Sequence, residues 1–251
     1  MDLHHERKAV AQVYKPIPAD FQPQKLTVVS AGDSLTQGVG DSTDQGGYLP
    51  YLKTMLEKEK GIKEVDISNF GVTGNRTTQL LKRLQSQEVR NQLQKADLVI
   101  LTIGGNDIMK VVRDNISNLK ISVFAEEKKS YITHLKQIMD VIVQENPQAS
   151  IVLVGLYNPF SQVFSNIEEM NQIVSDWNQA GKSVIANYPN AYFVEIEDLF
   201  LNTNEDLLYT DNFHPNDKGY ELIAGRLKQT LEKRTLPDLE KKSLMVSKEE
   251  N

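Results

Sequence analysis

Three residues whose types suit acyl transfer stand near opposite ends of this sequence. Ser34 lies in a Gly-Asp-Ser-Leu segment at residues 32–35, and Asp211 and His214 lie in an Asp-Asn-Phe-His-Pro segment. A serine hydroxyl becomes a nucleophile when a histidine removes its proton, and a carboxylate orients that histidine. The three residue types together predict covalent catalysis on an acyl group.

Two further segments could supply hydrogen-bond donors for the oxyanion of such a reaction. Residues 71–75 read Gly-Val-Thr-Gly-Asn, and residues 104–107 read Gly-Gly-Asn-Asp. A glycine at position 74 permits close approach of its backbone N–H, and the side chain of Asn106 carries an amide donor. We therefore expect an oxyanion hole formed by the backbone N–H groups of Ser34 and Gly74 and by the Asn106 amide.

Each of these residues has a commoner structural role when it is taken alone. A serine after Asp33 suits a turn or a helix N-cap, and Asn106 suits the same positions. Gly74 is typical of a turn with positive φ. Asp33 itself is expected to order the loop through hydrogen bonds. The catalytic interpretation depends on finding all the segments together and in this order.

Short apolar runs alternate with helical patterns along the chain. Strands are expected at residues 26–30, 65–70, 98–103, 151–155 and 191–194, and helices at 48–60, 77–95, 131–145, 167–187 and 216–233. Residues 108–124 show no clear pattern. The strand runs are continuously apolar, which is typical of a parallel sheet covered on both faces. We predict an α/β fold in which a five-stranded parallel sheet lies between two layers of helices.

The candidate residues all follow strand runs. Ser34, Gly74 and Asn106 come just after the first, second and third runs, and Asp211 and His214 follow the fifth. Ligands bind outside the carboxyl ends of the strands in open parallel sheets. We therefore expect these side chains to meet at one edge of the sheet.

The composition of the chain argues against several other classes of protein. The chain has 251 residues, a formal charge of −6 and no cysteine, which excludes disulfides and thiol catalysis. No basic block indicates nucleic-acid binding, and no apolar run approaches the roughly 18–20 residues of a membrane helix. We expect one domain over residues 25–234, an extended proline-containing leader over 1–24, and a disordered charged tail over 235–251.

No metal or cofactor is expected. Two of the four histidines lie in the leader, and His134 is isolated on a helical segment. The glycine-rich residues 38–47 lack the lysine of a phosphate-binding loop. A flavodoxin-like flavin binder shares the expected layers, but it has no need of Asp211 and His214.

Taken together, the four segments resemble those of the SGNH, or GDSL, hydrolases over about residues 25–230. The resemblance implies a flavodoxin-like three-layer α/β/α sandwich, with Ser34, Asp211 and His214 catalytic and Gly74 and Asn106 in the oxyanion hole. Residues 38–42, 155–160 and 213–216 are similar to GDSL lipase/acylhydrolase proteins of Gram-positive bacteria. Many of those carry a signal or anchor, which implies an extracytoplasmic location if such a segment precedes this chain and a cytoplasmic one otherwise.

The order Ser, Asp, His also occurs in α/β-hydrolases. However, Ser34 is not in a Gly-x-Ser-x-Gly segment and follows the first strand, which disfavours that fold.

We expect a serine ester hydrolase that acts on lipid-like or small acyl esters. Candidates for the substrate pocket are Ile108, Met109, Phe160 and Phe213, with Val111, Val112 and Phe164 beside them, although core packing is the commoner role for such side chains. The alternatives are a carbohydrate O-acetyl esterase, an acyltransferase, or a non-catalytic lipid- or glycan-binding protein on the same fold. The acyl length, the alcohol and the oligomeric state stay open.

Overall fold

One parallel sheet forms the centre of the computed structural model, which describes residues 23–115, 121–159, 168–201, 203–234 and 236. Its strands are β1 (Gln24–Gly32), β2 (Ile62–Gly71), β3 (Leu98–Thr102), β4 (Ser150–Val154) and β5 (Ala191–Val194). They lie in the order β2-β1-β3-β4-β5, and every neighbouring pair is parallel. The predicted five-stranded parallel sheet is confirmed.

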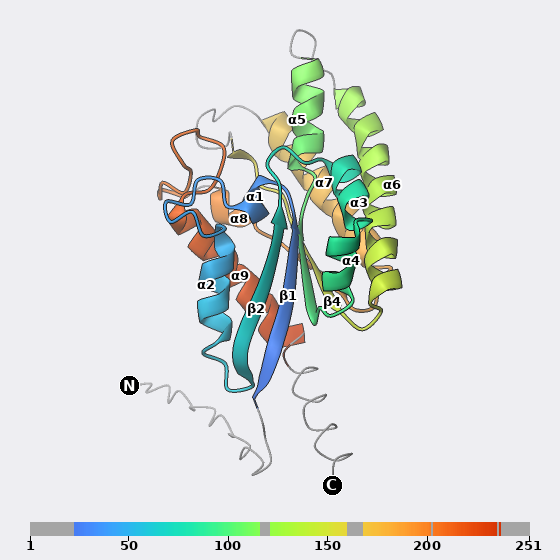
Figure 1. Ribbon diagram of the computed structural model, residues 1–251. Helices are drawn as coiled ribbons and strands as arrows, with labels where there is room; N and C mark the ends of the chain where they lie inside the picture. Colours follow the sequence, from blue (N-terminus) through green and yellow to red (C-terminus); the bar gives the residue numbers. More distant parts are fainter. Residues whose placement is uncertain (1–22, 116–120, 160–167, 202, 235, 237–251) are drawn as a thin grey trace, which may run out of the picture.

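Helices cover both faces of this sheet (Figure 1). One face carries α3 (Thr77–Leu84), α4 (Gln87–Leu93), α5 (Gly105–Asp114), α6 (Ile121–Glu145) and α7 (Glu168–Ile185). The other carries α2 (Tyr48–Leu56), α8 (Glu197–Phe200) and α9 (Asp217–Arg234). The short helix α1 (Ser34–Gln37) follows β1 directly. The result is the expected three-layer α/β/α sandwich.

The continuous apolar strands follow from this layering. In β1, Val29 and Ala31 face one core cluster, whereas Leu26 and Val28 face the other. Successive side chains of a strand point to opposite faces, so a strand buried on both faces does not alternate between apolar and polar residues.

Several element boundaries differ from the sequence-based expectation. The predicted helix over 77–95 is two helices, because the Ser86 side chain accepts a hydrogen bond from the Val89 N–H and caps a new helix, α4. Of the unassigned residues 108–124, those up to 114 belong to α5 and those from 121 belong to α6, while residues 116–120 lie outside the described ranges. The short helix α8 was not expected.

The predicted leader and tail lie almost wholly outside the described residues. Among the helices that the structure does describe, none combines the length and the apolarity needed to cross a bilayer.

The strand order places β1 between β2 and β3. The chain adds β2 on one side of β1, and the next strand, β3, pairs with the other side of β1. Such a point of reversal opens a crevice at the carboxyl ends of the strands. The ends of β1 and β3 leave no room there for a side chain on Gly32, since a Cβ built on it would lie 2.1 Å from the Thr102 carbonyl oxygen. Glycine at the end of β1 therefore lets the chain turn into α1 against β3.

Candidate active site

Ser34 is the first residue of α1, directly after β1, and its side chain is almost fully buried. Asp33 caps this helix, since its Oδ1 accepts hydrogen bonds from the Leu35 N–H at 3.1 Å and from the Thr102 hydroxyl at 2.9 Å. Asp33 thus orders the loop around Ser34, as expected from the sequence.

Asp33 is a buried carboxyl group that ends a chain of buried hydroxyls. Burial raises the pKa of Asp33 to about 7, against the hydrogen bonds from Thr102 and Leu35, which lower it. Behind Thr102, the Thr36 hydroxyl lies 2.8 Å from the Thr102 hydroxyl and 2.9 Å from that of Tyr48. The residues on both sides of Ser34 are therefore fixed by polar contacts, Asp33 to β3 and Thr36 to β3 and α2.

Asp211 and His214 lie in the loop between α8 and α9, and they point toward Ser34. The Nδ1 atom of His214 lies 2.6 Å from Asp211 Oδ2, and its Nε2 atom lies 2.8 Å from Ser34 Oγ. The structure thus brings together the three residues named from the sequence, in the geometric order that a nucleophile, a base and an orienting carboxylate require.

The local backbone favours the charged form of Asp211. Partial burial raises its pKa, but hydrogen bonds from the His214 ring and from the backbone N–H groups of His214 and Phe213 more than offset this effect. The pKa of Asp211 therefore lies below its usual value, and the group is a carboxylate at neutral pH.

The loop that carries His214 is held by a tyrosine that the sequence analysis did not single out. The Tyr157 hydroxyl donates to the Phe213 carbonyl oxygen at 2.6 Å, and its ring stacks on Phe200 at a centroid distance of 4.1 Å. Burial raises the pKa of Tyr157 well above its usual value, so this hydroxyl is a neutral donor. The sequence signals for Tyr157 were its position just after a strand and its place in the segment 155–160, which is similar to GDSL lipase/acylhydrolase proteins.

Gly74 and Asn106 are the two further residues that the sequence named as oxyanion donors. Gly74 has a φ of 78°, and the Asn106 side chain donates to the Asn75 carbonyl oxygen at 3.0 Å. This contact uses one of the two amide hydrogens and fixes the direction of the second. Within the part of the chain that the structure describes, no acceptor receives the backbone N–H of Ser34 or of Gly74. These donors are available to a bound oxygen.

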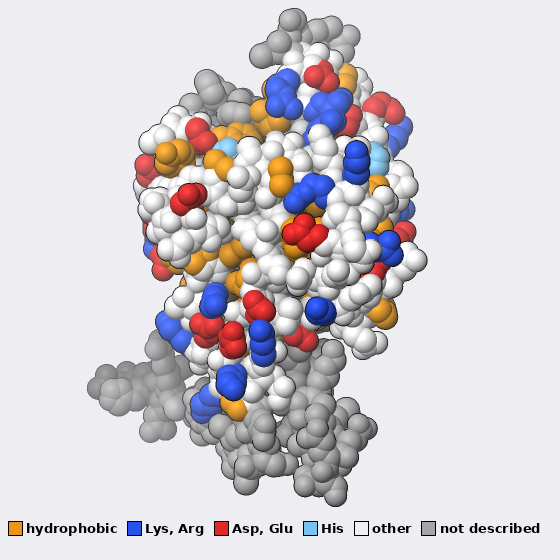
Figure 2. All heavy atoms as spheres, viewed as in Figure 1, with side chains coloured by type: hydrophobic (Ala, Val, Ile, Leu, Met, Phe, Trp, Pro, Cys, Tyr) orange, Lys and Arg blue, Asp and Glu red, His pale blue; other side chains and the backbone are white. Residues whose placement is uncertain are grey.

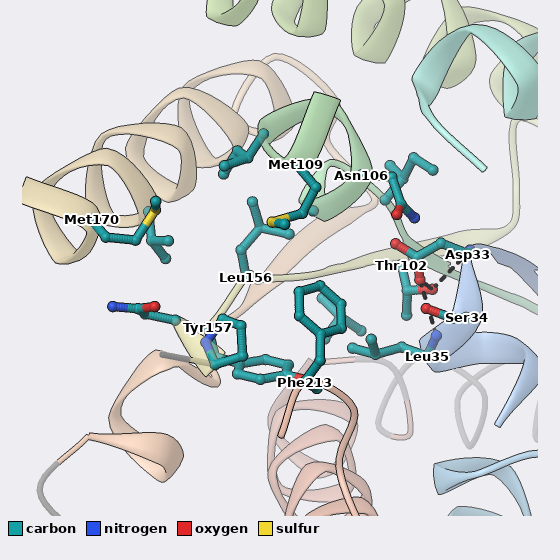
Figure 3. A pocket seen from close by; sticks show the side chains of 18 residues that line it. Asp33, Ser34, Leu35, Thr102, Asn106, Met109, Leu156, Tyr157, Met170 and Phe213 are labelled. Atoms are coloured by element: carbon teal, nitrogen blue, oxygen red, sulfur yellow. Dashed lines mark hydrogen bonds between the residues drawn. The ribbon is translucent and has the colours of Figure 1, made fainter. Parts of the chain in front are cut away.

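A largely apolar cavity opens beside Ser34 (Figure 3). Its volume is about 650 Å³ when the part open to solvent is included. The expected Ile108, Met109 and Phe213 line it, together with Leu35, Leu156, Tyr157, Met170 and Val174. Figure 3 shows Met170 at the far end from Ser34, with Met109, Leu156 and Phe213 between them.

Four of the pocket candidates have a different outcome. Val111 belongs to an apolar core cluster and Val112 packs against that cluster, and neither lines the cavity. Phe160 and Phe164 lie outside the described residues. Met170 and Val174 were missed, although their spacing of four residues on a predicted helix indicated a shared face.

Apolar and charged side chains occupy different parts of the face seen in Figure 2. Apolar side chains lie at the upper left, near the end of the sheet that carries α1, and charged side chains gather at the top of the view and over the opposite ends of the strands. Val72 and Tyr209 are large apolar side chains that stay exposed in the loops after β2 and before His214.

No group of three or more histidine, aspartate or glutamate side chains within the described ranges is arranged to hold a metal ion. His134, which appeared isolated in the sequence, has its Nδ1 atom 3.5 Å from the Thr77 hydroxyl.

Comparison with known proteins agrees with this geometry. The model of the GDSL-like lipase/acylhydrolase family matches residues 30–222. The uncharacterised protein YpmR of Bacillus subtilis is 38% identical over 85% of this chain and 84% of its own length. The spore germination lipase LipC of Bacillus licheniformis is 27% identical over 81% of this chain and 95% of its own.

Among solved structures, the lipase Lip_vut3 from a goat rumen metagenome superposes with a TM-score of 0.74 at 25% identity, covering 81% of this chain and 96% of that one. The fold, the matched segments and the relatives lead to the same assignment. The chain belongs to the GDSL-like lipase/acylhydrolase family and is a carboxylic ester hydrolase.

Proposed function

We propose that this protein hydrolyses esters of apolar acyl chains, with Ser34 as nucleophile, His214 as general base and Asp211 as the orienting carboxylate. The observation that carries the proposal is the unbroken line of hydrogen bonds from Asp211 through His214 to the Ser34 hydroxyl, at 2.6 and 2.8 Å. The roles of the three residues follow from this order.

In the first half of the reaction, Ser34 Oγ attacks the ester carbonyl carbon while His214 Nε2 takes its proton. Asp211 stabilises the resulting imidazolium and holds the ring tautomer. The imidazolium then protonates the leaving alcohol, and the C–O bond of the ester breaks. In the second half, His214 removes a proton from water, which attacks the acyl-enzyme and releases the acid and Ser34.

The negative oxygen formed in each half is assigned to the backbone N–H groups of Ser34 and Gly74 and to the Asn106 amide. Neither backbone N–H donates to another acceptor among the residues that the structure describes, which supports this role for the two groups. Removal of one such donor typically lowers kcat by about 10²–10³. We therefore treat Asn106→Ala as a second test of the same site.

An apolar acyl chain is the substrate feature that the cavity supports best. Leu156, Met109 and Met170 line its length, and methionine side chains adapt to flexible chains. The similarity to a spore germination lipase supports a lipid-like ester. Acetylated sugars would place hydroxyl groups against these apolar walls without hydrogen-bond partners.

The test is hydrolysis of p-nitrophenyl esters from acetate to palmitate by the wild type, by Ser34→Ala and by Ser183→Ala. Ser183 is an exposed serine on α7 and serves as the matched control. We expect a rate optimum above acetate, near-complete loss of activity in Ser34→Ala and no change in Ser183→Ala. Activity that survives in Ser34→Ala, or a wild type that neither hydrolyses any ester nor reacts with a fluorophosphonate, contradicts the proposal.

A further inference from the structure

Asp107 is a buried carboxylate beside the site that the proposed reaction does not use. Its residue is 2% exposed, and it lies next to Asn106 in the first turn of α5. One oxygen accepts the Thr77 hydroxyl at 2.7 Å, and the other accepts the Thr77 backbone N–H at 3.0 Å. These two bonds join α5 to the start of α3.

The carboxylate acts as the N-terminal cap of a different helix. Thr77 is the first residue of α3, and the N-cap residue of α3 is Arg76, which is not among the side chains that usually cap a helix. A negative charge at a helix N-terminus is favourable, because the first N–H groups have no partner inside the helix. Burial is the larger effect and raises the pKa of Asp107 above its usual value, while the hydrogen bonds from Thr77 oppose this rise and favour the charged form.

A second contact runs beside the first. Asn106 donates its side-chain amide to the Asn75 carbonyl oxygen at 3.0 Å. Two consecutive residues of α5 therefore bind the chain at positions 75 and 77, immediately after Gly74. On the other side of Gly74, the Val72 N–H donates to the Gly32 carbonyl oxygen at 3.0 Å.

The Gly74 segment is thus attached to β1 at one end and to α5 at the other. A Cβ built on Gly74 meets no atom within 4 Å, so side-chain packing does not hold this glycine in place. Three further hydrogen bonds hold the residues beside Gly74: the Thr73 N–H and hydroxyl donate to Gln37 Oε1, and the Asn75 N–H donates to the Val72 carbonyl oxygen at 3.1 Å. The contacts with α5 fix the end of the segment that follows this turn, so they help to set the direction of the Gly74 N–H. The Thr77 hydroxyl also lies 3.5 Å from His134 Nδ1, which extends the same polar cluster to α6.

We propose that Asp107 is a positioning residue that sets the place of the Gly74 N–H relative to the Asn106 amide. The inference rests on the proposed function, since it concerns the same oxyanion hole. Donors of an oxyanion hole act at about 2.7–3.1 Å from the charged oxygen, so a small displacement of the Gly74 segment weakens binding of the transition state. Ground-state binding of the acyl chain depends on other residues, so the expected effect is on kcat.

The test compares Asp107→Asn, Thr77→Val and Thr77→Ser with Asp114→Asn. Asp114 is an exposed carboxylate on the same helix, paired with Lys110, and it is the matched control. We measure kcat and KM on the preferred p-nitrophenyl ester, and the inhibition constant of a trifluoromethyl ketone with the same acyl chain. Ser34 adds to this ketone to form a tetrahedral oxyanion. The affinity of the protein for the ketone therefore measures how well the oxyanion hole binds the charged oxygen.

We expect kcat to fall about 10- to 100-fold in Asp107→Asn and Thr77→Val, less than for the loss of a donor, because the donor is displaced and not removed. The affinity for the ketone should fall in parallel, while KM stays within about twofold. Thr77→Ser keeps both donors and should retain activity, as should Asp114→Asn.

The outcomes separate this inference from the proposed function. If Ser34→Ala or Asn106→Ala keeps full activity, the proposed site itself is wrong. If both lose activity while a folded Asp107→Asn keeps wild-type kcat, only the positioning role is wrong. If Asp107→Asn does not fold, Thr77→Val decides: wild-type kcat, or a rise in KM at constant kcat, overturns the inference.

Discussion

His214 Nε2 lies 2.8 Å from Ser34 Oγ, although 180 positions separate the two residues in the chain. Ser34 is placed by β1 and α1, whereas His214 belongs to a loop that packs against the end of β4 through Tyr157. Their contact therefore depends on the order of the strands in the sheet. Changes on either side of this contact give distinct, measurable effects.

Asp211→Asn should lower kcat by roughly 10³–10⁴, as expected when the orienting carboxylate of such a site becomes an amide. The amide can still accept the backbone N–H groups of Phe213 and His214, so the loop keeps its shape. However, its NH₂ group donates to His214 Nδ1 and selects the tautomer that cannot take a proton from Ser34. Steady-state kinetics on the preferred p-nitrophenyl ester measures the loss.

The matched control for this change is Asp206→Asn, an exposed carboxylate in the same loop. It should leave kcat unchanged. Equal losses in both variants would mean that the loop responds to charge in general and not to the contact with His214.

Asp33→Asn should change how stability depends on pH. The pKa of Asp33 is raised to about 7 in the folded protein, so between pH 4 and 7 the folded state binds more protons at this group than the unfolded state does. The free energy of unfolding of the wild type therefore falls as pH rises through this window, by up to about 1.4 kcal/mol per pH unit from this one group. Asn cannot ionise and lacks this contribution.

Urea unfolding of the wild type and of Asp33→Asn at a series of pH values isolates the effect. Both hydrogen bonds to Asp33 are accepted by Oδ1, which an asparagine retains, so the variant should fold. The difference in the free energy of unfolding between the wild type and Asp33→Asn should change steadily between pH 4 and 7. Parallel curves would show that Asp33 titrates with an ordinary pKa.

Gly32→Ala should destabilise the fold by about 1–3 kcal/mol or more, the usual range for a side chain forced into occupied space. The new Cβ would lie 2.1 Å from the Thr102 carbonyl oxygen, and backbone atoms of a central strand cannot move aside cheaply. Gly225→Ala, within α9, is the opposite case, because its Cβ meets nothing within 4 Å. It should stabilise the protein by about 0.5–1 kcal/mol, since alanine favours helix over glycine. Thermal unfolding of both variants checks the contrast.

Met170→Trp should shift the preferred acyl length toward shorter chains. Met170 lies at the end of the cavity far from Ser34, so a larger side chain shortens the space for the acyl tail (Figure 3). Each buried methylene contributes about 0.8 kcal/mol, or about fourfold in kcat/KM, so loss of two or three methylenes should cost about 15- to 60-fold on long esters. Acetate hydrolysis should stay the same.

The control for this variant is Gln172→Trp, an exposed position on the same helix, which should leave the chain-length profile unchanged. A profile that is equally unchanged in Met170→Trp would mean that the acyl chain leaves Ser34 in another direction.

The sheet and the meeting of Ser34, Asp211 and His214 could be predicted from the sequence for one physical reason. Strands buried on both faces are continuously apolar, which makes them easy to recognise, and the carboxyl ends of parallel strands share one edge. Residues that follow such strands are therefore neighbours, whatever their separation along the chain.

The features that were missed depend on contacts between distant elements. Tyr157 supports the His214 loop through a carbonyl oxygen, and Asp107 caps α3 from α5; neither contact leaves a periodic pattern in the sequence. The break between α3 and α4 depends on a single capping serine within an otherwise helical stretch. Local propensity is too weak to locate such a break.

The position of His214 after the last strand of the sheet also has a consequence for the protein during its synthesis. A growing chain acquires Ser34, Gly74 and Asn106 first, and it acquires Asp211 and His214 only after the five strands of the sheet have been made. On the proposed roles, the nascent chain therefore carries the nucleophile before its base has been made. On the proposed mechanism, ester cleavage begins only once the last loop and α9 have packed onto the finished sheet, so the nascent enzyme cannot attack the esters around it.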